Sequence, residues 1–275
     1  MKIGVALGGG GVRGLAHAVA LEAIDGMGIV PAALAGTSMG AIIGAMYASG
    51  RSGREITESV EQHIITTEDR LADILRKRGR LVKWLKAVSP SWRSSGLFKA
   101  DGFLHYLLDE IGVETFEDLK IPLSIATTDF HRGEPVVFSS GELMPAIRAS
   151  MAIPGIFVPA EHEGRILVDG GVTDNLPYDL LPGDCDATIA VDVGPERKDG
   201  DGKAPTMVEA TLGMFDTLID KVTEYRLKHD PPTVYIRPRL TGIRTLDFEK
   251  AGTVLEQARK ATDDFKSRLE RVAKS

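Results

Sequence analysis

The first 50 residues alternate between short apolar runs and stretches in which apolar residues recur at helical spacing. The two runs, at 2–7 and 29–35, have the length and composition of β-strands. Helical spacing over 12–27 predicts a helix that Gly28 ends, and residues 41–48 are apolar on nearly every side, which indicates a buried helix. This alternation of strands and helices favours a parallel sheet covered by helices.

The remainder of the chain continues the alternation, except for one stretch. Residues 51–95 are polar, have helical propensity and become basic towards their end, so we expect a helical insertion there. Further strands are predicted at 123–130, 135–139, 157–161, 165–168, 187–193 and 233–237, and further helices at 103–111, 142–151, 206–229 and 248–272. The sequence thus predicts one α/β domain over residues 1–275. Its mainly parallel central sheet is sandwiched by helices, and the C-terminal helices span about 206–272.

Composition and charge are those of an ordinary globular protein, with 43% hydrophobic and 26% charged residues. The net charge of −6 and the pI near 5.6 argue against nucleic-acid binding. The single cysteine, Cys185, excludes an internal disulfide, and no residues have zinc-site or calcium-loop spacing, so no metal is expected. No apolar stretch approaches the roughly 18 residues of a membrane span, and no signal-peptide cleavage site follows the first strand. We therefore expect a soluble, cytoplasmic protein.

A G-x-S-x-G pattern, Gly36-Thr37-Ser38-Met39-Gly40, lies between the second apolar run and the apolar helix. A serine on a sharp strand-to-helix turn has a strained backbone, and glycines two positions away on either side avoid the clash of a Cβ. The serine hydroxyl then projects at the N-terminus of the next helix. Ser38 is therefore a candidate nucleophile. The alternative is a plain turn in which Ser38 is the helix N-cap.

A run of glycines separates the first predicted strand from the first predicted helix, and it has three interpretations. The backbone N–H groups of Gly9, Gly10 and Gly11, with that of Met39, would form an oxyanion hole. Alternatively, Gly9, Gly11 and Gly14 satisfy the dinucleotide fingerprint G-x-G-x-x-G, but the acidic residue expected about 20 positions further on is missing. The third interpretation is a tight turn packed through its glycines.

A serine nucleophile needs a base, and histidine is the usual partner. The six histidines are His17, His63, His105, His131, His162 and His229. None of them lies in a recognisable motif at the end of a predicted strand. An α/β-hydrolase is also disfavoured, because only one full strand–helix unit precedes the strand that leads to Ser38. Motifs alone therefore do not identify a histidine base.

Three blocks occur in the order GGGVRG at 9–14, GTSMG at 36–40 and DGG at 169–171. With ASMAIPG at 149–155 and NLP at 175–177, they resemble the patatin-like phospholipases, and the short bacterial members in particular. The resemblance implies a patatin-like three-layer fold and hydrolysis of acyl esters in lipids. It also implies a catalytic dyad of Ser38 and Asp169 without histidine, and neither a metal nor a cofactor.

The dyad implied by the resemblance is physically reasonable. Asp169 ends an apolar run, and partial desolvation with a hydrogen bond to Ser38 would raise the basicity of its carboxylate. Ester hydrolysis also demands less of its base than amide hydrolysis does. The residues expected to support the site are Arg13, Gly14, Gly36, Gly40, Gly170 and Gly171.

Several other residues near these motifs have two interpretations. Arg13 would steady the glycine loop or contact a phosphate; alternatively, it is a solvated helix residue. Asp174 is expected to be a turn residue that caps its own backbone. Ile42, Ile43 and Met46 would form a wall of an acyl pocket or, in the ordinary case, pack in the core.

Three functions are compatible with these features. The first is a lipid acyl hydrolase of the phospholipase A, lysophospholipase or carboxylesterase type, acting on (lyso)phospholipids or related lipids. The second is a dinucleotide-binding oxidoreductase, which the missing ribose-binding acid disfavours. The third is a catalytically silent lipid-binding or regulatory protein on the same fold, which the presence of every dyad and glycine-loop element disfavours. No pattern indicates the oligomeric state.

The segment 71–93 differs from the rest of the chain in its charge. It contains seven Lys or Arg residues and only one acid, Asp73, within a chain of net charge −6. Both tryptophans, Trp84 and Trp92, lie in it beside an apolar stripe that Gly79 interrupts. This pattern is typical of a helix that lies in a membrane interface, so we expect peripheral contact with the inner face of the membrane. The alternative is a helical pair that covers the core.

Overall fold

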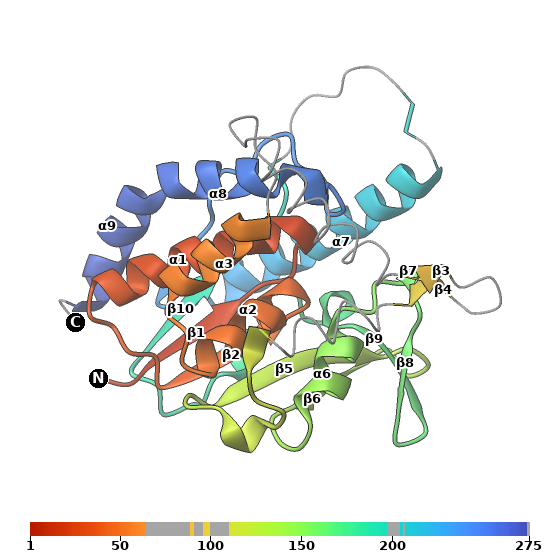
Figure 1. The fold of residues 1–275 in the computed structure, drawn as a ribbon, viewed down its shortest axis with the longest axis horizontal. Coiled ribbons are helices and arrows are strands. Elements are labelled where there is room, and N and C mark those ends of the chain that lie inside the picture. Colours follow the sequence, from red (N-terminus) through yellow and green to blue (C-terminus); the bar gives the residue numbers. More distant parts are fainter. Residues whose placement is uncertain (64–88, 91–95, 100–109, 197–203, 206, 274–275) are drawn as a thin grey trace.

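The computed structural model describes residues 1–63, 89–90, 96–99, 110–196, 204–205 and 207–273 (Figure 1). Its main feature is an eight-stranded sheet in the order β11-β10-β1-β2-β5-β9-β8, with β6 paired to β5. These strands are β1 (Ile3–Leu7), β2 (Ala33–Thr37), β5 (Leu123–Asp129), β6 (Glu134–Phe138), β8 (Ala160–His162), β9 (Arg165–Asp169), β10 (Ala187–Val191) and β11 (Val234–Ile236). The neighbours from β11 to β5 pair in parallel, whereas β6, β8 and β9 pair antiparallel. The mainly parallel sheet predicted from the sequence is therefore confirmed.

The helices cover both faces of this sheet and complete the predicted three layers (Figure 1). They are α1 (Ala16–Gly26), α2 (Met39–Ala48), α3 (Gly53–His63), α6 (Leu143–Ser150), α7 (Met207–His229), α8 (Ala251–Lys260) and α9 (Thr262–Ala273). Alternate side chains of β1 separate the two interfaces, because successive residues of a strand point to opposite faces. Val5 and Leu7 pack in the core with α1 and α2, whereas Ala6 packs with Leu176 and Tyr178 on the other face.

Two predicted strands have other bounds because prolines interrupt them. The run 29–35 becomes a strand only at Ala33, since Pro31 has no N–H for the ladder. The run 157–161 is divided around Pro159 into the end of β7 (Gly155–Phe157) and the start of β8. The strand β7 belongs to a second sheet of order β3-β4-β7, in which β3 is Ser89–Pro90 and β4 is Gly96–Lys99.

The predicted helices at 142–151 and 206–229 are confirmed, whereas the predicted helix at 248–272 and the predicted helical insertion at 51–95 need correction. The helix predicted over 248–272 is two helices, which break at Ala261 where Asp263 and Asp264 begin a new first turn. In the predicted insertion at 51–95, residues 53–63 are helical as expected, but Ser89 and Pro90 form a strand. Residues 64–88, 91–95 and 100–109 lie outside the described residues, and with them most of the segment 71–93 and of the helix predicted at 103–111. The membrane contact predicted for 71–93 therefore stays a prediction.

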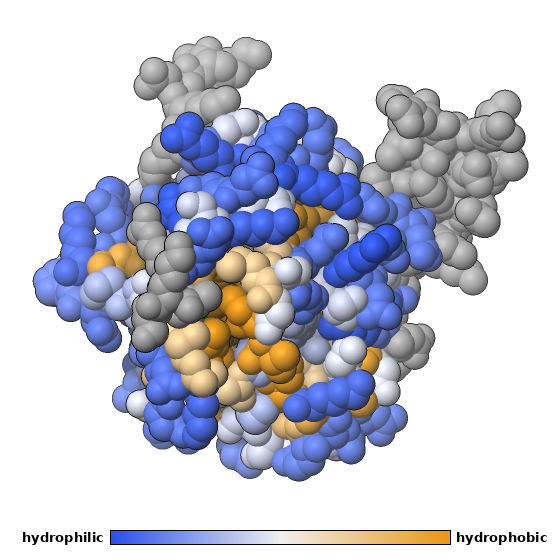
Figure 2. All heavy atoms as spheres, turned by 90° about the vertical axis from the view of Figure 1, so that its left-hand side faces the viewer, coloured by the Kyte–Doolittle hydropathy of each residue, from blue (hydrophilic) through white to orange (hydrophobic). Residues whose placement is uncertain are grey.

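The two ends of the parallel strands differ in character. The carboxyl ends of β1 and β2 lead into the glycine loop and the Ser38 turn. At the amino ends, Met1 and Val30 are among the exposed large apolar residues. Figure 2 shows the end of the molecule that lies on the left of Figure 1, where apolar residues are visible among polar ones. Among the described residues, no helix is both long enough and apolar enough to cross a bilayer.

Candidate active site

Ser38 lies in the sharp turn between β2 and α2, with φ of 54° and ψ of −122°. A non-glycine residue in this region is strained by about 1–3 kcal/mol, and such strain concentrates at functional sites. The turn is possible because Gly36 and Gly40 have no Cβ. A Cβ on Gly36 would lie 2.7 Å from the Ala41 backbone, and one on Gly40 would overlap the Leu7 carbonyl. Ser38 occupies the N-cap position of α2, as the alternative expected, but its side chain makes no capping hydrogen bond.

A second serine, Ser150 at the end of α6, fixes the backbone of the turn. The Ser38 N–H donates to Ser150 Oγ at 2.8 Å, and that hydroxyl donates to the Ala126 carbonyl at 2.7 Å. Ser150 is completely buried. The sequence contained no signal for this contact apart from the position of Ser150 in the stretch 149–155.

Asp169 is the last residue of β9, and the sheet brings it beside the Ser38 turn. The strand that leads to Ser38, β2, and the strand that ends at Asp169, β9, both pair with β5. Thr37 is opposite Ala126 and Asp169 is opposite Thr127, so the two strand ends meet at neighbouring positions of β5. Its Oδ1 accepts a hydrogen bond from the Gly171 N–H at 2.7 Å. Burial raises the pKa of Asp169 from 3.8 to about 6, although the hydrogen bonds from Gly171 and from the Ser38 side chain oppose the rise. The expectation that the hydrogen bond to Ser38 would raise the basicity of Asp169 is therefore wrong, because a donated hydrogen bond stabilises the carboxylate. A carboxylate with this pKa accepts a proton more readily than an exposed one, yet is ionised at neutral pH.

The glycine loop lies against the residues that follow Asp169. The Gly9 N–H donates to the Asn175 carbonyl at 2.9 Å, and Asn175 Nδ2 donates to the Gly9 carbonyl at 3.3 Å. The predicted role of Gly9 as an oxyanion donor is therefore wrong, because its N–H is already bound. Among the described residues, no acceptor binds the N–H groups of Gly10, Gly11 or Met39. Gly10 and Gly11 line the same pocket as Ser38 and Asp169.

His17 lies beneath this loop and is completely buried. Its Nε2 is 2.7 Å from the Gly8 carbonyl oxygen, so the ring supports the loop from behind. Burial lowers the pKa of His17 to about 4, which keeps the ring neutral at pH 7. No described histidine lines the pocket that contains Ser38. The side chain of His63 and all of His105 lie outside the described residues.

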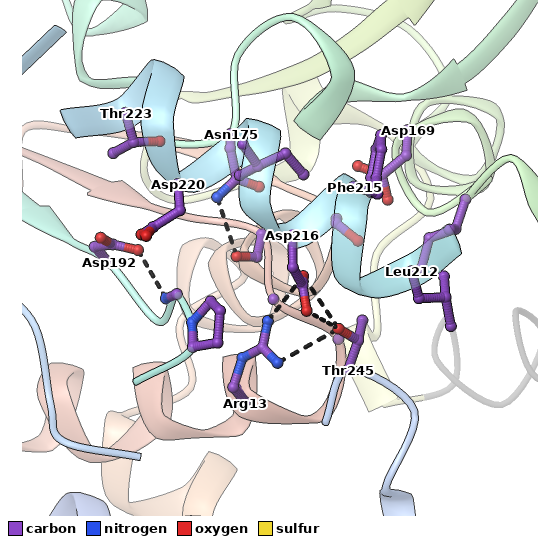
Figure 3. Close-up of a pocket in the computed structure, with 18 residues that line it drawn as sticks. Arg13, Asp169, Asn175, Asp192, Leu212, Phe215, Asp216, Asp220, Thr223 and Thr245 are labelled. Atoms are coloured by element: carbon purple, nitrogen blue, oxygen red, sulfur yellow. Dashed lines mark hydrogen bonds and ion pairs between the residues drawn. The ribbon is translucent and has the colours of Figure 1, made fainter. Parts of the chain in front are cut away.

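Arg13 is buried, with 1% of its surface exposed, so the alternative of a solvated helix residue is wrong. Its Nε donates to the Val193 carbonyl at 3.0 Å, and its Nη2 forms an ion pair with Asp216 of α7 at 3.2 Å. Thr245 Oγ1 also donates to this carboxylate, at 3.0 Å from Oδ2 (Figure 3). Arg13 therefore ties the glycine loop to α7.

The candidate active site is a pocket that α7 closes on one side. Leu212, Phe215 and Ile219 of α7 give it an apolar wall with Ile153, whereas Asp216 and Asp220 of the same helix belong to its polar part (Figure 3). The residues Ile42, Ile43 and Met46 pack in the core instead. Within the described residues, no three His, Cys, Asp or Glu side chains are grouped to hold a metal ion.

Asp174 lies three residues after Gly171. The prediction that it caps its own backbone is wrong. Its carboxylate forms an ion pair with Arg226 of α7, which also binds Asp179 at 2.5 Å. Burial raises the pKa of Asp174, and the charge of Asp179 acts in the same direction. The role of α7 in the site was missed because its contacts with residues 13, 174 and 237 join parts of the chain that no local pattern connects.

The comparisons with known proteins agree with this geometry. A family model described as patatin-like phospholipase matches residues 5–182. An uncharacterized NTE family protein of Mycobacterium bovis is 34% identical over 228 residues, which are 78% of this chain and 58% of that protein. The lysophospholipase nte1 of Aspergillus fumigatus is 29% identical over 92% of this chain, but only 16% of that protein is covered.

Solved structures with the same fold are more distant in sequence. VipD of Legionella pneumophila matches with a TM-score of 0.53 and 14% identity, over 97% of this chain and 66% of VipD. ExoU of Pseudomonas aeruginosa, solved with SpcU, matches with a TM-score of 0.50 and 15% identity, over 98% of this chain and 52% of ExoU. The family model matches well over half of the residues of this chain, and the chain therefore belongs to the patatin-like phospholipase family.

Proposed function

We propose that this chain hydrolyses acyl esters of lysophospholipids or related lipids, with Ser38 as nucleophile and Asp169 as its base. The observation that carries the proposal is the pairing of a strained Ser38 with a buried carboxylate in one pocket. The family supports a lipid ester as substrate. Because the chain spans 58% of its mycobacterial relative and 16% of the fungal one, the reaction that it catalyses is inferred from the site.

The proposed reaction begins when Asp169 takes the proton of the Ser38 hydroxyl as Oγ attacks the ester carbonyl carbon. The negative charge on the carbonyl oxygen is stabilised by the N–H groups of Gly10, Gly11 and Met39, which have no acceptor among the described residues. Collapse of the tetrahedral intermediate breaks the ester C–O bond, and Asp169 returns the proton to the leaving alkoxide. Water then attacks the acyl-enzyme, with Asp169 again as base, and releases a free fatty acid and Ser38.

The pocket is suited to a substrate with an apolar chain and a polar end. Ile153, Leu212, Phe215 and Ile219 provide an apolar side for an acyl chain. A dinucleotide is not favoured, because both backbone groups of Gly9 are bound to Asn175 and the position after β2 is a serine rather than an acid.

The rate of ester hydrolysis is expected to depend on the ionisation of Asp169. Only the deprotonated carboxylate accepts the Ser38 proton, and the pKa of Asp169 is raised to about 6. We expect kcat/KM for a soluble p-nitrophenyl ester to rise tenfold per pH unit below about pH 6 and to level off above it. A profile that is flat from pH 4 to pH 8 would exclude a base with this pKa.

The proposed substrate class is tested by the release of fatty acid from lysophosphatidylcholine. The wild type is expected to release fatty acid with or without EDTA, since no step uses a metal. Ser38→Ala is expected to release it at least about 10³-fold more slowly. Binding of the lipid without release of fatty acid would instead identify a silent lipid-binding protein.

A further inference from the structure

Helix α7 exposes a row of large apolar side chains along its outer side. Met207, Met214, Leu218, Val222 and Tyr225 are between 49% and 84% exposed, and we call them the α7 ridge. Their spacing of three, four or seven residues places them on one face of the helix. Single exposed apolar residues are common, but a row along one helix indicates a contact surface.

The ridge continues into the wall of the pocket. A helix turns by about 100° per residue, so the seven apolar residues between positions 212 and 225 share one arc of about 160°. These residues are Leu212, Met214, Phe215, Leu218, Ile219, Val222 and Tyr225. No polar residue of 212–225 lies within this arc. Leu212, Phe215 and Ile219 line the pocket, whereas the other four face solvent. One apolar flank of α7 therefore leads from the outer surface to the pocket that Ser38 lines.

Ion pairs hold α7 so that the ridge faces outwards. Asp216 binds Arg13 at 3.2 Å, Asp220 binds Arg237 at 2.8 Å, and Arg226 binds Asp174. The partners of α7 in these pairs, Arg13, Arg237 and Asp174, lie on three separate segments of the chain. Rotation of α7 that would bury the ridge would break these partly buried pairs, which is costly.

The charges beside the ridge are complementary to phosphate head groups. Lys221 and Lys228, both about two-thirds exposed, bind the single carboxylate of Glu224 at 2.7 and 3.0 Å. Two cations therefore share one anion along the edge of the ridge that lies next to Met214. Lysines at such an edge extend to the phosphates while the apolar side chains enter the acyl region, and Tyr225 is suited to the boundary.

We propose that the α7 ridge is the surface on which the protein rests on a phospholipid bilayer or micelle, so that a lipid tail reaches the pocket along the apolar flank of α7. The inference rests on the proposed function, because it identifies where the lipid substrate enters. A lipid fits better than a second copy of the chain. A protein bound to the ridge would also cover the flank that leads to the pocket, whereas a lipid surface supplies the molecule that passes along it.

The test is the double variant Leu218→Asp/Val222→Asp, neither residue of which lines the pocket. Vesicles of phosphatidylcholine and phosphatidylglycerol that contain lysophosphatidylcholine are the probe, in co-sedimentation and in fatty-acid release. We expect at least tenfold weaker binding and at least tenfold slower release from vesicles, because two carboxylates would enter the acyl region. Hydrolysis of soluble p-nitrophenyl butyrate should stay within twofold of wild type. The matched control is Val30→Asp. Val30 is 79% exposed at the opposite end of the strands, so this variant should bind vesicles and release fatty acid as the wild type does.

Other outcomes separate this inference from the proposed function. Ser38→Ala is expected to bind vesicles as well as wild type, so a protein without esterase activity still tests the ridge. If the double variant misfolds by circular dichroism, Leu218→Ser/Val222→Ser replaces it. Vesicle binding equal to wild type in a folded ridge variant would overturn the inference. So would a change from dimer to monomer in that variant with vesicle binding intact, because the ridge would then be a self-interface.

Discussion

Replacement of Asp169 by asparagine is expected to slow ester hydrolysis by at least about 10³-fold while making the folded protein more stable at pH 8. The first effect follows because an amide cannot take the proton of Ser38. Ser38→Ala is expected to lose activity to a similar extent, since a nucleophile and its base act as a unit.

The gain in stability follows from the burial of Asp169. Its pKa rises from 3.8 to about 6 on folding, so the unfolded chain loses the proton at a lower pH than the folded protein does. The folded state is therefore penalised as pH rises from about 4 to 6, and the full penalty persists above that range. It amounts to roughly 3 kcal/mol. Asparagine has no charge to bury, and its side-chain oxygen still accepts the hydrogen bond from Gly171.

Activity on a p-nitrophenyl ester and urea unfolding at pH 5 and pH 8 measure the two effects on one sample. The free energy of unfolding of Asp169→Asn should exceed that of wild type at pH 8, and the difference should shrink towards pH 4. An inactive variant that is also less stable at pH 8 would show that Asp169 supports the fold rather than serving as a buried base.

Gly40→Ala is expected to unfold the protein or to destabilise it by more than about 3 kcal/mol, beyond the usual cost of overpacking. The added Cβ would overlap the Leu7 carbonyl and approach the Gly8 carbonyl at 2.7 Å. Both atoms belong to the backbone at the end of β1, so no side chain can rotate to make room. The first turn of α2 would have to leave β1, and the Ser38 turn with it.

Gly44→Ala, one turn further along α2, is the matched control. A Cβ there would lie 3.4 Å from Leu123 Cδ1, an ordinary contact, and alanine favours a helix by up to about 1 kcal/mol. This variant should be as stable as wild type or slightly more so in chemical denaturation. Equal losses in both variants would contradict the close approach at Gly40 as the reason for its glycine.

The Ser38 turn was predictable because a sharp strand-to-helix turn needs glycine within two residues of its serine, and the five-residue pattern shows these glycines. The reason is local only for Gly36, where a Cβ would meet the Ala41 backbone. Gly40 and Gly170 approach the backbone of Leu7 and of Ala126, which lie in other strands, so the pattern marks these glycines without revealing their contacts. The division of the predicted strand 157–161 was also readable, since Pro159 cannot donate to a ladder.

The rest of the site depends on contacts between distant parts of the chain. The N–H of Gly9 was expected to face the substrate but is bound by Asn175, which is 166 positions away. Arg13 was as compatible with solvent as with burial, because Asp216 and Thr245 lie more than 200 positions further on. No short pattern marks α7 as the wall of the pocket, since its apolar residues could equally have faced the core.

The central claim is that Asp169 activates Ser38, and the rate at which a fluorophosphonate labels the protein tests it most directly. We expect one adduct by intact mass, on the peptide that contains Ser38, and none in Ser38→Ala. In Asp169→Asn, which keeps the fold, labelling should slow by at least about 10²-fold, because the probe reacts with an activated hydroxyl. An adduct on another residue, or wild-type labelling of Ser38 in Asp169→Asn, would contradict the dyad.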